Sequence, residues 1–238
     1  MTRLKRLTTP GLLVAVAAMV VVTATATAAT INGTARSEFL RGTNGPDTIN
    51  GHRGFDRIVG RGGDDILNGN RGQDRVFGGA GNDTADGGLG NDRVFGGAGN
   101  DIVRGDYGND RTSGGDGDDQ SYGGPGNDVI YANRGADTSY GGPGNDHLWA
   151  LARADVALPG VDTLNGEDGN DTFHTRDGEP DNISCGNGND NALLDVEDVI
   201  VDATPGNPNG SCERVVRKAP KKSEDKSEAK SEEPTPSK

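Results

Sequence analysis

The stretch GGAGNDTADGGLGNDRVFGGAGNDIVR, residues 78–104, contains three blocks of nine residues that follow one pattern. Blocks of this length run without insertion from Gly33 to Trp149, and the last twelve carry Gly at the fourth position and Asp at the sixth. A fixed period this short is typical of a solenoid in which each repeat forms one structural unit. The function therefore depends on the side chains that successive repeats bring together when they stack.

Within each block, the first six residues have turn chemistry and the last three have strand chemistry. Gly permits positive φ, and Asn and Asp favour turns. One residue of each short strand is predicted to point inward. These inward positions are Ile49, Ile58, Leu67, Val76, Ala85, Val94, Val103, Thr112, Ser121, Ile130, Ser139 and Leu148.

The side chains that flank the inward positions repeat every eighteen residues rather than every nine. The repeated sets are Arg57, Arg75, Arg93 and Arg111; Phe77 and Phe95; and Tyr122 and Tyr140. We therefore predict that two blocks complete one turn of the coil, so that blocks eighteen residues apart stack in one parallel sheet, about 4.8 Å apart. Duplication of an eighteen-residue unit is a compatible explanation of the same period.

Composition limits the ways in which such a coil can be stabilised. The chain of 238 residues has 40 Gly and only 4% aromatic residues, so it has little apolar material for a packed core. Its formal charge is −13, which argues against nucleic-acid backbones and anionic membrane surfaces as main partners. Cations are the natural complement of this charge.

Stacking the blocks brings the carboxylates of successive turns close together. Like charges about 5 Å apart repel by roughly 1 to 3 kcal/mol per pair. A divalent cation between the turns reverses this effect, with Asp carboxylates and the carbonyl groups of the Gly-rich turns as ligands. Oxygen ligands in a flexible geometry suit Ca²⁺ better than Mg²⁺. We therefore expect the calcium-free chain to be disordered or loosely folded.

The repeated GGxGxD blocks resemble those of the hemolysin-type calcium-binding proteins, also called repeats-in-toxin or RTX proteins. The resemblance covers residues 42–149 in register, with further copies at GEDGND (166–171) and CGNGND (185–190). It implies an all-β fold, a right-handed parallel β-roll with two nonapeptides per turn, and several Ca²⁺ ions held between turns eighteen residues apart.

By this resemblance, each ion is ligated by the sixth-position Asp and by turn carbonyls. The best pairs would be Asp83 with Asp101, Asp92 with Asp110, Asp101 with Asp119, Asp110 with Asp128, and Asp128 with Asp146. Further candidates are Asp47, Asp56, Asp65, Asp74, Asp137, Asp171 and Asp190. The first four of these follow Thr43, His52, Arg61 and Asn70 at the second position, and Asp137 follows ANRGA, so these blocks depart from the pattern.

The ends of the chain indicate export. Residues 1–28 read as a signal peptide, with Arg3, Lys5 and Arg6 before an apolar run over 12–22 and a cleavage site after Ala28. An uncleaved membrane anchor is the alternative, but it needs about 18 or more apolar residues. No other segment could span a bilayer. Residues 217–238, rich in Lys, Glu, Ser and Pro, are predicted to be a disordered charged tail.

Between these ends we predict an N-terminal cap or degenerate repeat at 29–41, the calcium-binding roll at 42–149, and irregular repeats with a cap at 150–216. An excursion or a local helix is expected at residues 149–159, because the step from Asp146 to Asp162 breaks the register. Cys185 and Cys212 lie outside the array, and export favours one disulfide over two free thiols. The resemblance implies that this disulfide closes the cap.

No catalytic constellation is recognisable. His52, His147 and His174 are interpreted as solvated, and the paired carboxylates of the blocks are explained by calcium and by turns. The outward row Arg57, Arg75, Arg93 and Arg111 lies beside Val59, Phe77, Phe95, Tyr131 and Trp149. One interpretation of this face is that the aliphatic parts of the Arg side chains cover exposed rings. The alternative is that the face binds a ligand, either a glycan or a cell-surface protein.

The sequence therefore predicts a non-enzymatic, secreted, extracellular or cell-surface calcium-binding protein that folds on binding Ca²⁺ and has a structural, adhesive or surface-binding role. The alternative is an accessory calcium-binding module of a secreted polysaccharide-acting or hydrolytic enzyme. Ice binding would need a regular Thr or Asn array at the third position of the blocks, and this chain has none.

Overall fold

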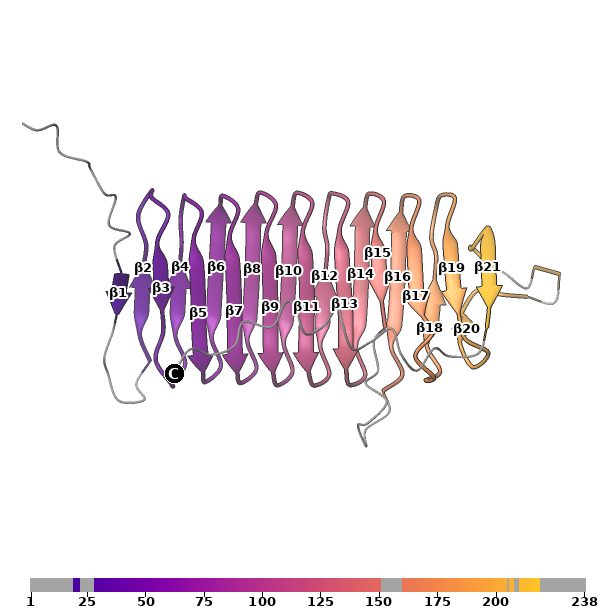
Figure 1. Cartoon of the computed structure of the whole chain (residues 1–238), viewed down its shortest axis with the longest axis horizontal. Coiled ribbons are helices and arrows are strands. Elements are labelled where there is room, and N and C mark those ends of the chain that lie inside the picture. The colour runs from indigo at the N-terminus through magenta and orange to yellow at the C-terminus, as the bar shows by residue number, and fades with distance from the viewer. Residues whose placement is uncertain (1–18, 22–27, 151–159, 205, 208–209, 219–238) are drawn as a thin grey trace, which may run out of the picture.

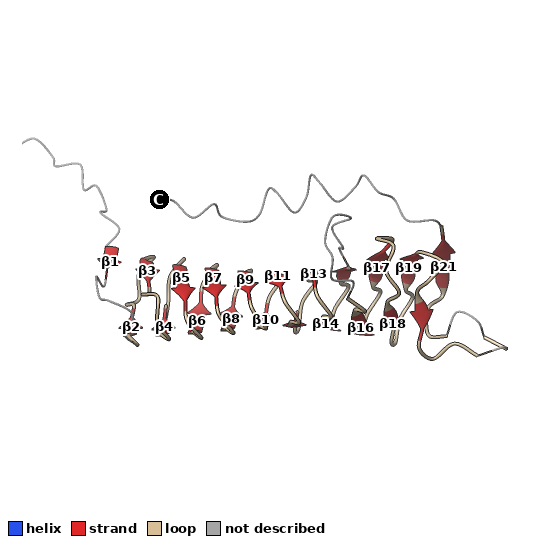
Figure 2. Ribbon diagram, turned by 90° about the horizontal axis from the view of Figure 1, so that it is seen from below, coloured by secondary structure: helices blue, strands red, loops and turns tan. Residues whose placement is uncertain are grey.

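The computed structural model describes residues 19–21, 28–150, 160–204, 206–207 and 210–218. Its regular elements are all strands, which form two parallel sheets and confirm the predicted β-solenoid. Figure 1 shows the strands stacked side by side along one long axis, and Figure 2 shows that the two sheets face one another as layers. In the described residues, no helix has the length and apolar character needed to cross a membrane.

Odd-numbered strands form an eleven-stranded sheet, here called the odd sheet. Its strands are β1 (Met19–Val21), β3 (Phe39–Arg41), β5 (Arg57–Gly62), β7 (Arg75–Ala80), β9 (Arg93–Ala98), β11 (Arg111–Asp116), β13 (Val129–Arg134), β15 (His147–Trp149), β17 (Thr172–Thr175), β19 (Asn191–Leu194) and β21 (Arg214–Arg217).

Even-numbered strands form a ten-stranded sheet, the even sheet. Its strands are β2 (Thr30–Asn32), β4 (Thr48–Asn50), β6 (Ile66–Arg71), β8 (Thr84–Leu89), β10 (Ile102–Tyr107), β12 (Gln120–Tyr122), β14 (Thr138–Pro143), β16 (Thr163–Asp168), β18 (Asn182–Ser184) and β20 (Val199–Ile200).

The strand register confirms that two blocks make one turn of the coil. In the odd sheet, Val76 pairs with Val94, and in the even sheet Ala85 pairs with Val103, so each residue lies beside the residue eighteen positions later. Buried residues alternate with more exposed ones along β5, β7 and β9, as a period of two requires. All twelve predicted inward side chains are buried.

The interior contains two apolar clusters. One runs from Ile31 to Val103, and the other runs from Ile130 to Cys212. Thr112, Ser121 and Ser139 are buried near the junction, and their hydroxyl oxygens have no hydrogen-bond partner within the described chain. These three residues therefore weaken the core at the place where the sequence loses its aliphatic inward positions.

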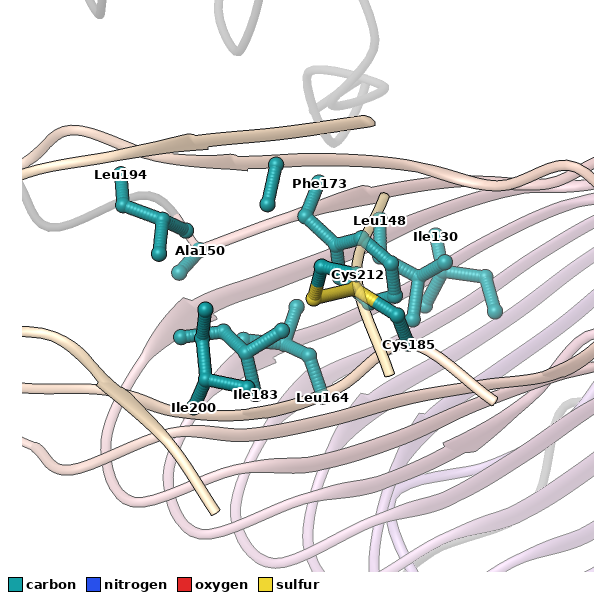
Figure 3. Packing of buried hydrophobic residues seen from close by; sticks show 11 residues of the cluster. Ile130, Leu148, Ala150, Leu164, Phe173, Ile183, Cys185, Leu194, Ile200 and Cys212 are labelled. Atoms are coloured by element: carbon teal, nitrogen blue, oxygen red, sulfur yellow. A yellow bond between two sulfur atoms is a disulfide. The ribbon is translucent and has the colours of Figure 1, made fainter. Parts of the chain in front are cut away.

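Beyond residue 150 the rungs continue with altered spacing. β14 pairs with β16 and β15 pairs with β17, so Leu148 lies beside Phe173 although twenty-five residues separate them. The expected excursion falls at residues 151–159, which lie outside the described residues. Cys185 and Cys212 form a disulfide, as predicted, within the second apolar cluster (Figure 3).

Candidate calcium-binding ladders

The sixth residue of each block is the last residue before a strand, and this position builds two ladders of carboxylates. The backbone N–H of Asp83 donates to Oδ1 of Asp101 at 2.7 Å, and the N–H of Asp101 donates to Oδ1 of Asp119 at 2.8 Å. The same bond recurs from turn to turn along both edges of the roll. Each carboxylate is therefore held by the backbone of the preceding turn.

The odd ladder, which precedes the strands of the odd sheet, contains Glu38, Asp56, Asp74, Asp92, Asp110, Asp128, Asp146, Asp171, Asp190 and Glu213. The even ladder contains Asp47, Asp65, Asp83, Asp101, Asp119, Asp137, Asp162, Asp181 and Asp198.

The second carboxylate oxygen of most of these residues is buried without a partner in the described chain. This holds for Oδ2 of Asp56, Asp65, Asp74, Asp83, Asp92, Asp101, Asp110, Asp119, Asp128, Asp137, Asp146, Asp171, Asp181 and Asp190. A buried polar atom without a partner costs free energy, and for an ionised carboxylate the cost is larger. A repeated set of such oxygens is what a series of bound cations would satisfy.

The first-position glycines leave space beside these oxygens. A Cβ added to Gly123 would lie 2.5 Å from Oδ2 of Asp128 and 2.5 Å from the carbonyl oxygen of Gly141, in the next turn. A side chain here would displace the two oxygens. The described residues contain no group of three or more His, Cys, Asp or Glu side chains that could hold a metal, so backbone carbonyls must complete any ligand set. Such hard oxygen donors fit Ca²⁺.

Burial is the main cause of altered acidity in the ladders. Burial, with a smaller contribution from neighbouring carboxylates, raises the pKa of Asp65 to about 7, of Asp128 to about 8 and of Asp137 to about 9. Hydrogen bonds from the backbone act in the opposite direction but are outweighed. In the absence of a cation, the fold therefore disfavours the charged form of these groups.

We expect the calcium-free chain to gain β-structure as the pH falls. An unfolded Asp loses its proton near pH 3.8, whereas folded Asp128 keeps it up to about pH 8. Between these values the folded state binds more protons, so its stability rises on acidification and falls as pH increases. Circular dichroism in chelator at about pH 5 and about pH 8 checks this. A β-signal that is equal at both values, or larger at the higher pH, would contradict it.

The structure brings together all fourteen Asp residues predicted from the sequence, and all are buried. It also places Glu38, Asp162, Asp181, Asp198 and Glu213 in the ladders, which the prediction had not included as ligands. Glu38 could have been found, because it occupies the sixth position of the block that begins at Gly33. Asp162, Asp181, Asp198 and Glu213 each come after a change in the spacing between blocks, so a search with a fixed nine-residue period does not find them.

The irregular blocks keep the ladder but differ in detail. His52, Arg61 and Asn70 adopt the positive φ that Gly has at the second position elsewhere. Thr43 instead donates its N–H to Oδ2 of Asp47 at 2.6 Å, so this carboxylate oxygen already has a partner. In the block that contains Asp137, the first position is Ala132, which is buried. Its methyl group fills the space that a glycine leaves open in the other blocks.

The fold and the ladders define a class of protein: a parallel β-solenoid with regularly repeated cation-binding turns. The sequence profile of the family described as RTX calcium-binding nonapeptide repeat (4 copies) matches residues 32–54, 51–85, 77–112, 86–121, 113–148 and 156–192. These matches cover more than half of the chain, so the chain belongs to this family and is a calcium-binding repeat protein. A comparison with curated proteins gives no significant match.

Proposed function

We propose that this protein is secreted, folds when it binds Ca²⁺ outside the cell, and then serves as a structural, adhesive or surface-binding element. The observation that carries this proposal is the pair of buried ladders whose Oδ2 atoms lack partners. No catalytic role is needed to explain these carboxylates. The rigid roll would present its outer faces to a partner such as a glycan or a cell-surface protein.

Coupling between folding and calcium follows from the chemistry of the ladders. Without a cation, each rung buries a carboxylate next to the carboxylates of its neighbours. Binding that occurs only in the folded state stabilises that state by mass action. The residues that would hold the ions are the sixth-position Asp residues of both ladders, together with turn carbonyls. Asp47 and Asp137 would contribute least, because Thr43 and Ala132 occupy their surroundings.

Titration of residues 29–238 with Ca²⁺ and with Mg²⁺ tests the proposal. We expect a cooperative change from coil to β-structure by circular dichroism, with several Ca²⁺ ions bound per chain and little response to Mg²⁺. Asp101→Asn keeps an oxygen that can accept the bond from Asp83 but removes the charge, so the transition should need more calcium. Asp116→Asn, on an exposed carboxylate, is the matched control. A chelated chain that remains fully folded would refute the proposal.

Secretion is tested separately. Cleavage after Ala28 would remove Arg3, Lys5 and Arg6 and produce a mature chain that begins at Ala29. Strand β1 lies within the removed segment, so the mature roll would begin with β2 and β3. The mass of the protein recovered from the medium of an expressing culture should correspond to residues 29–238. Retention of the intact chain in a membrane fraction would support the anchor instead.

A further inference from the structure

The net charge of −13 does not describe the surface of the N-terminal half of the roll. Residues 33–111 contain ten Arg and twelve acidic residues. Nine of the twelve acids belong to the buried ladders, and the three that are not buried are Asp64, Asp86 and Asp106. The outer surface of this half is therefore strongly basic, while its acidic groups face the turns where calcium would bind.

A groove of about 630 Å³ runs along one edge of this basic half, and we call it the arginine groove. Arg57, Arg75, Arg93 and Arg111 line it, and they lie side by side on successive strands of the odd sheet. The opposite side carries Asn91, Asn109 and further polar side chains at the fifth position of the blocks. Buried members of the odd ladder lie at its base. The groove thus joins a row of cations to a row of amides.

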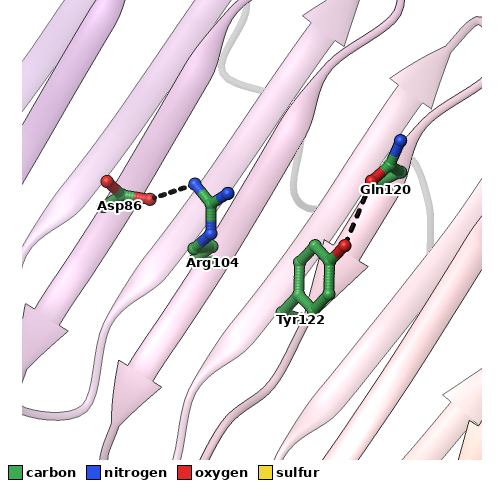
Figure 4. Close-up of polar contacts among 4 residues, drawn as sticks. All are labelled: Asp86, Arg104, Gln120 and Tyr122. Carbon is green, nitrogen blue, oxygen red and sulfur yellow. Dashed lines mark hydrogen bonds and ion pairs between the residues drawn. The ribbon is translucent and has the colours of Figure 1, made fainter.

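Aromatic rings hold Arg57 in place, whereas two other arginines of the row have no ion-pair partner within the described residues. Arg57 lies over the rings of Phe39 and Phe77, at 5.6 and 5.4 Å from their centroids. Phe77 stacks on Phe95 at 5.1 Å, which stiffens the neighbouring row of rings. Arg75 and Arg93 are exposed and form no ion pair within the described residues, whereas Arg104 on the even sheet pairs with Asp86 (Figure 4).

Four like charges spaced by one strand repel one another. Among the residues that line the groove, the opposite charges are the ladder carboxylates, which would bind calcium in the loaded roll and so would not compensate Arg75 and Arg93. An anionic ligand with regularly spaced charges would provide this compensation. Guanidinium groups bind carboxylate and sulfate-like oxygens through paired hydrogen bonds. The Oδ1 atoms of Asn91 and Asn109 already accept backbone N–H groups of the next turn, which leaves their amide NH2 groups to donate to hydroxyl groups. Charge and hydrogen-bonding capacity therefore occur together along the same line.

We propose that the arginine groove binds an acidic polysaccharide, an extended chain of sugars that carry carboxylate or sulfate groups. A pyranose ring with its linkage is about as long as the separation between neighbouring strands, roughly 5 Å, so successive sugars can meet successive Arg residues. This inference rests on the proposed function, because only the folded, calcium-loaded roll aligns the row. It goes beyond that function by naming the class of partner.

Nucleic acid fits the groove less well. Phosphates along one strand of a duplex advance by about 3.4 Å of helix axis while they wind around it, so they do not form a straight row that matches the arginine spacing. Single strands are usually bound with aromatic side chains on which bases stack. The groove has one ring, Phe55, at its end, and the stacked Phe77 and Phe95 are not among its lining residues. An acidic peptide lacks the hydroxyl groups that the Asn row would recognise.

The test measures binding of the calcium-loaded chain to immobilised dextran sulfate, carboxymethyl-dextran and neutral dextran, which share one backbone. We expect binding to the two charged polymers only, weakening as salt is added. Arg75→Gln with Arg93→Gln should weaken binding at least tenfold. The matched control, Arg61→Asn with Arg104→Gln, removes the same charge outside the groove and should change binding by less than twofold.

Calcium titration and circular dichroism on every variant separate this proposal from the proposed function. A chain that does not respond to calcium would refute the proposed function and remove the basis of the arginine groove. A chain that folds with calcium but binds no charged dextran would overturn the groove proposal alone. Equal loss in the groove and control variants would also overturn it, as would tighter binding to duplex DNA or to polyglutamate than to charged dextran.

Discussion

Replacing Gly63 by alanine is expected to prevent the neighbouring rungs from stacking, even in saturating calcium. Gly63 has φ of +92°, a region that L-residues with a side chain rarely adopt. Its Cβ would lie 2.5 Å from the carbonyl carbon of Gly45 and 2.6 Å from the nitrogen of Pro46. Both atoms belong to the backbone of the preceding turn, so neither can move without separating the two turns.

The adjacent glycine supplies the control for this prediction. A Cβ on Gly62 would come no closer than 3.6 Å to any neighbouring atom, the carbonyl oxygen of Ala80. We therefore expect Gly62→Ala to keep the number of bound Ca²⁺ ions and the circular dichroism of the parent. Gly63→Ala should lose at least one ion and part of the β-signal. Indistinguishable calcium binding by the two variants would show that the turns do not approach as closely as described.

Replacing Phe173 by alanine is expected to destabilise the C-terminal half of the roll by about 3 to 5 kcal/mol, the usual cost of removing a large buried ring. Phe173 is fully buried and belongs to the cluster that includes the disulfide (Figure 3). It lies between Leu148 and Ala192 in the odd sheet. Because the neighbouring Ala192 is small, we expect the variant to retain a cavity.

Urea unfolding in saturating calcium, with the disulfide intact, measures this effect. Phe55→Ala is the matched control, because the Phe55 ring is 66% exposed and its loss should change stability by less than about 0.5 kcal/mol. Contacts in a solenoid are mainly between neighbouring repeats, so the loss should appear first in the C-terminal rungs. Equal destabilisation by the two variants would contradict the assignment of Phe173 to the core.

Much of the candidate site could be predicted because each block repeats the same local chemistry. Once Val76 pairs with Val94, every other contact of the strict array follows by adding nine or eighteen residues. The burial of Asp83 and Asp101 follows in the same way. The sequence does not predict the pairing of turns where the spacing changes: the N–H of Asp146 donates to Oδ1 of Asp171, twenty-five residues later, and the N–H of Asp171 donates to Oδ1 of Asp190, nineteen residues later.

The blocks that depart from the repeat pattern differ among themselves in how their turns are built. His52, Arg61 and Asn70 accept the conformation of glycine, so their turns keep the ladder. Thr43, in contrast, bonds to the carboxylate that it precedes. Thr43 is buried and its hydroxyl group also contacts Asp47, whereas the three other residues are exposed. A list of residue types at the second position does not contain this information.

By itself, the amino-acid sequence determined the solenoid, the eighteen-residue turn, the inward positions and the carboxylates of the regular blocks. Local periodicity suffices for these features, because a shift of one residue between strands would turn the inward side chains outward. Tertiary structure alone decided which carboxylate oxygens lack partners, how the chain resumes after residue 160, and that the arginine row and the asparagine row border one groove. These features depend on the distances between turns, which a repeated sequence pattern does not specify.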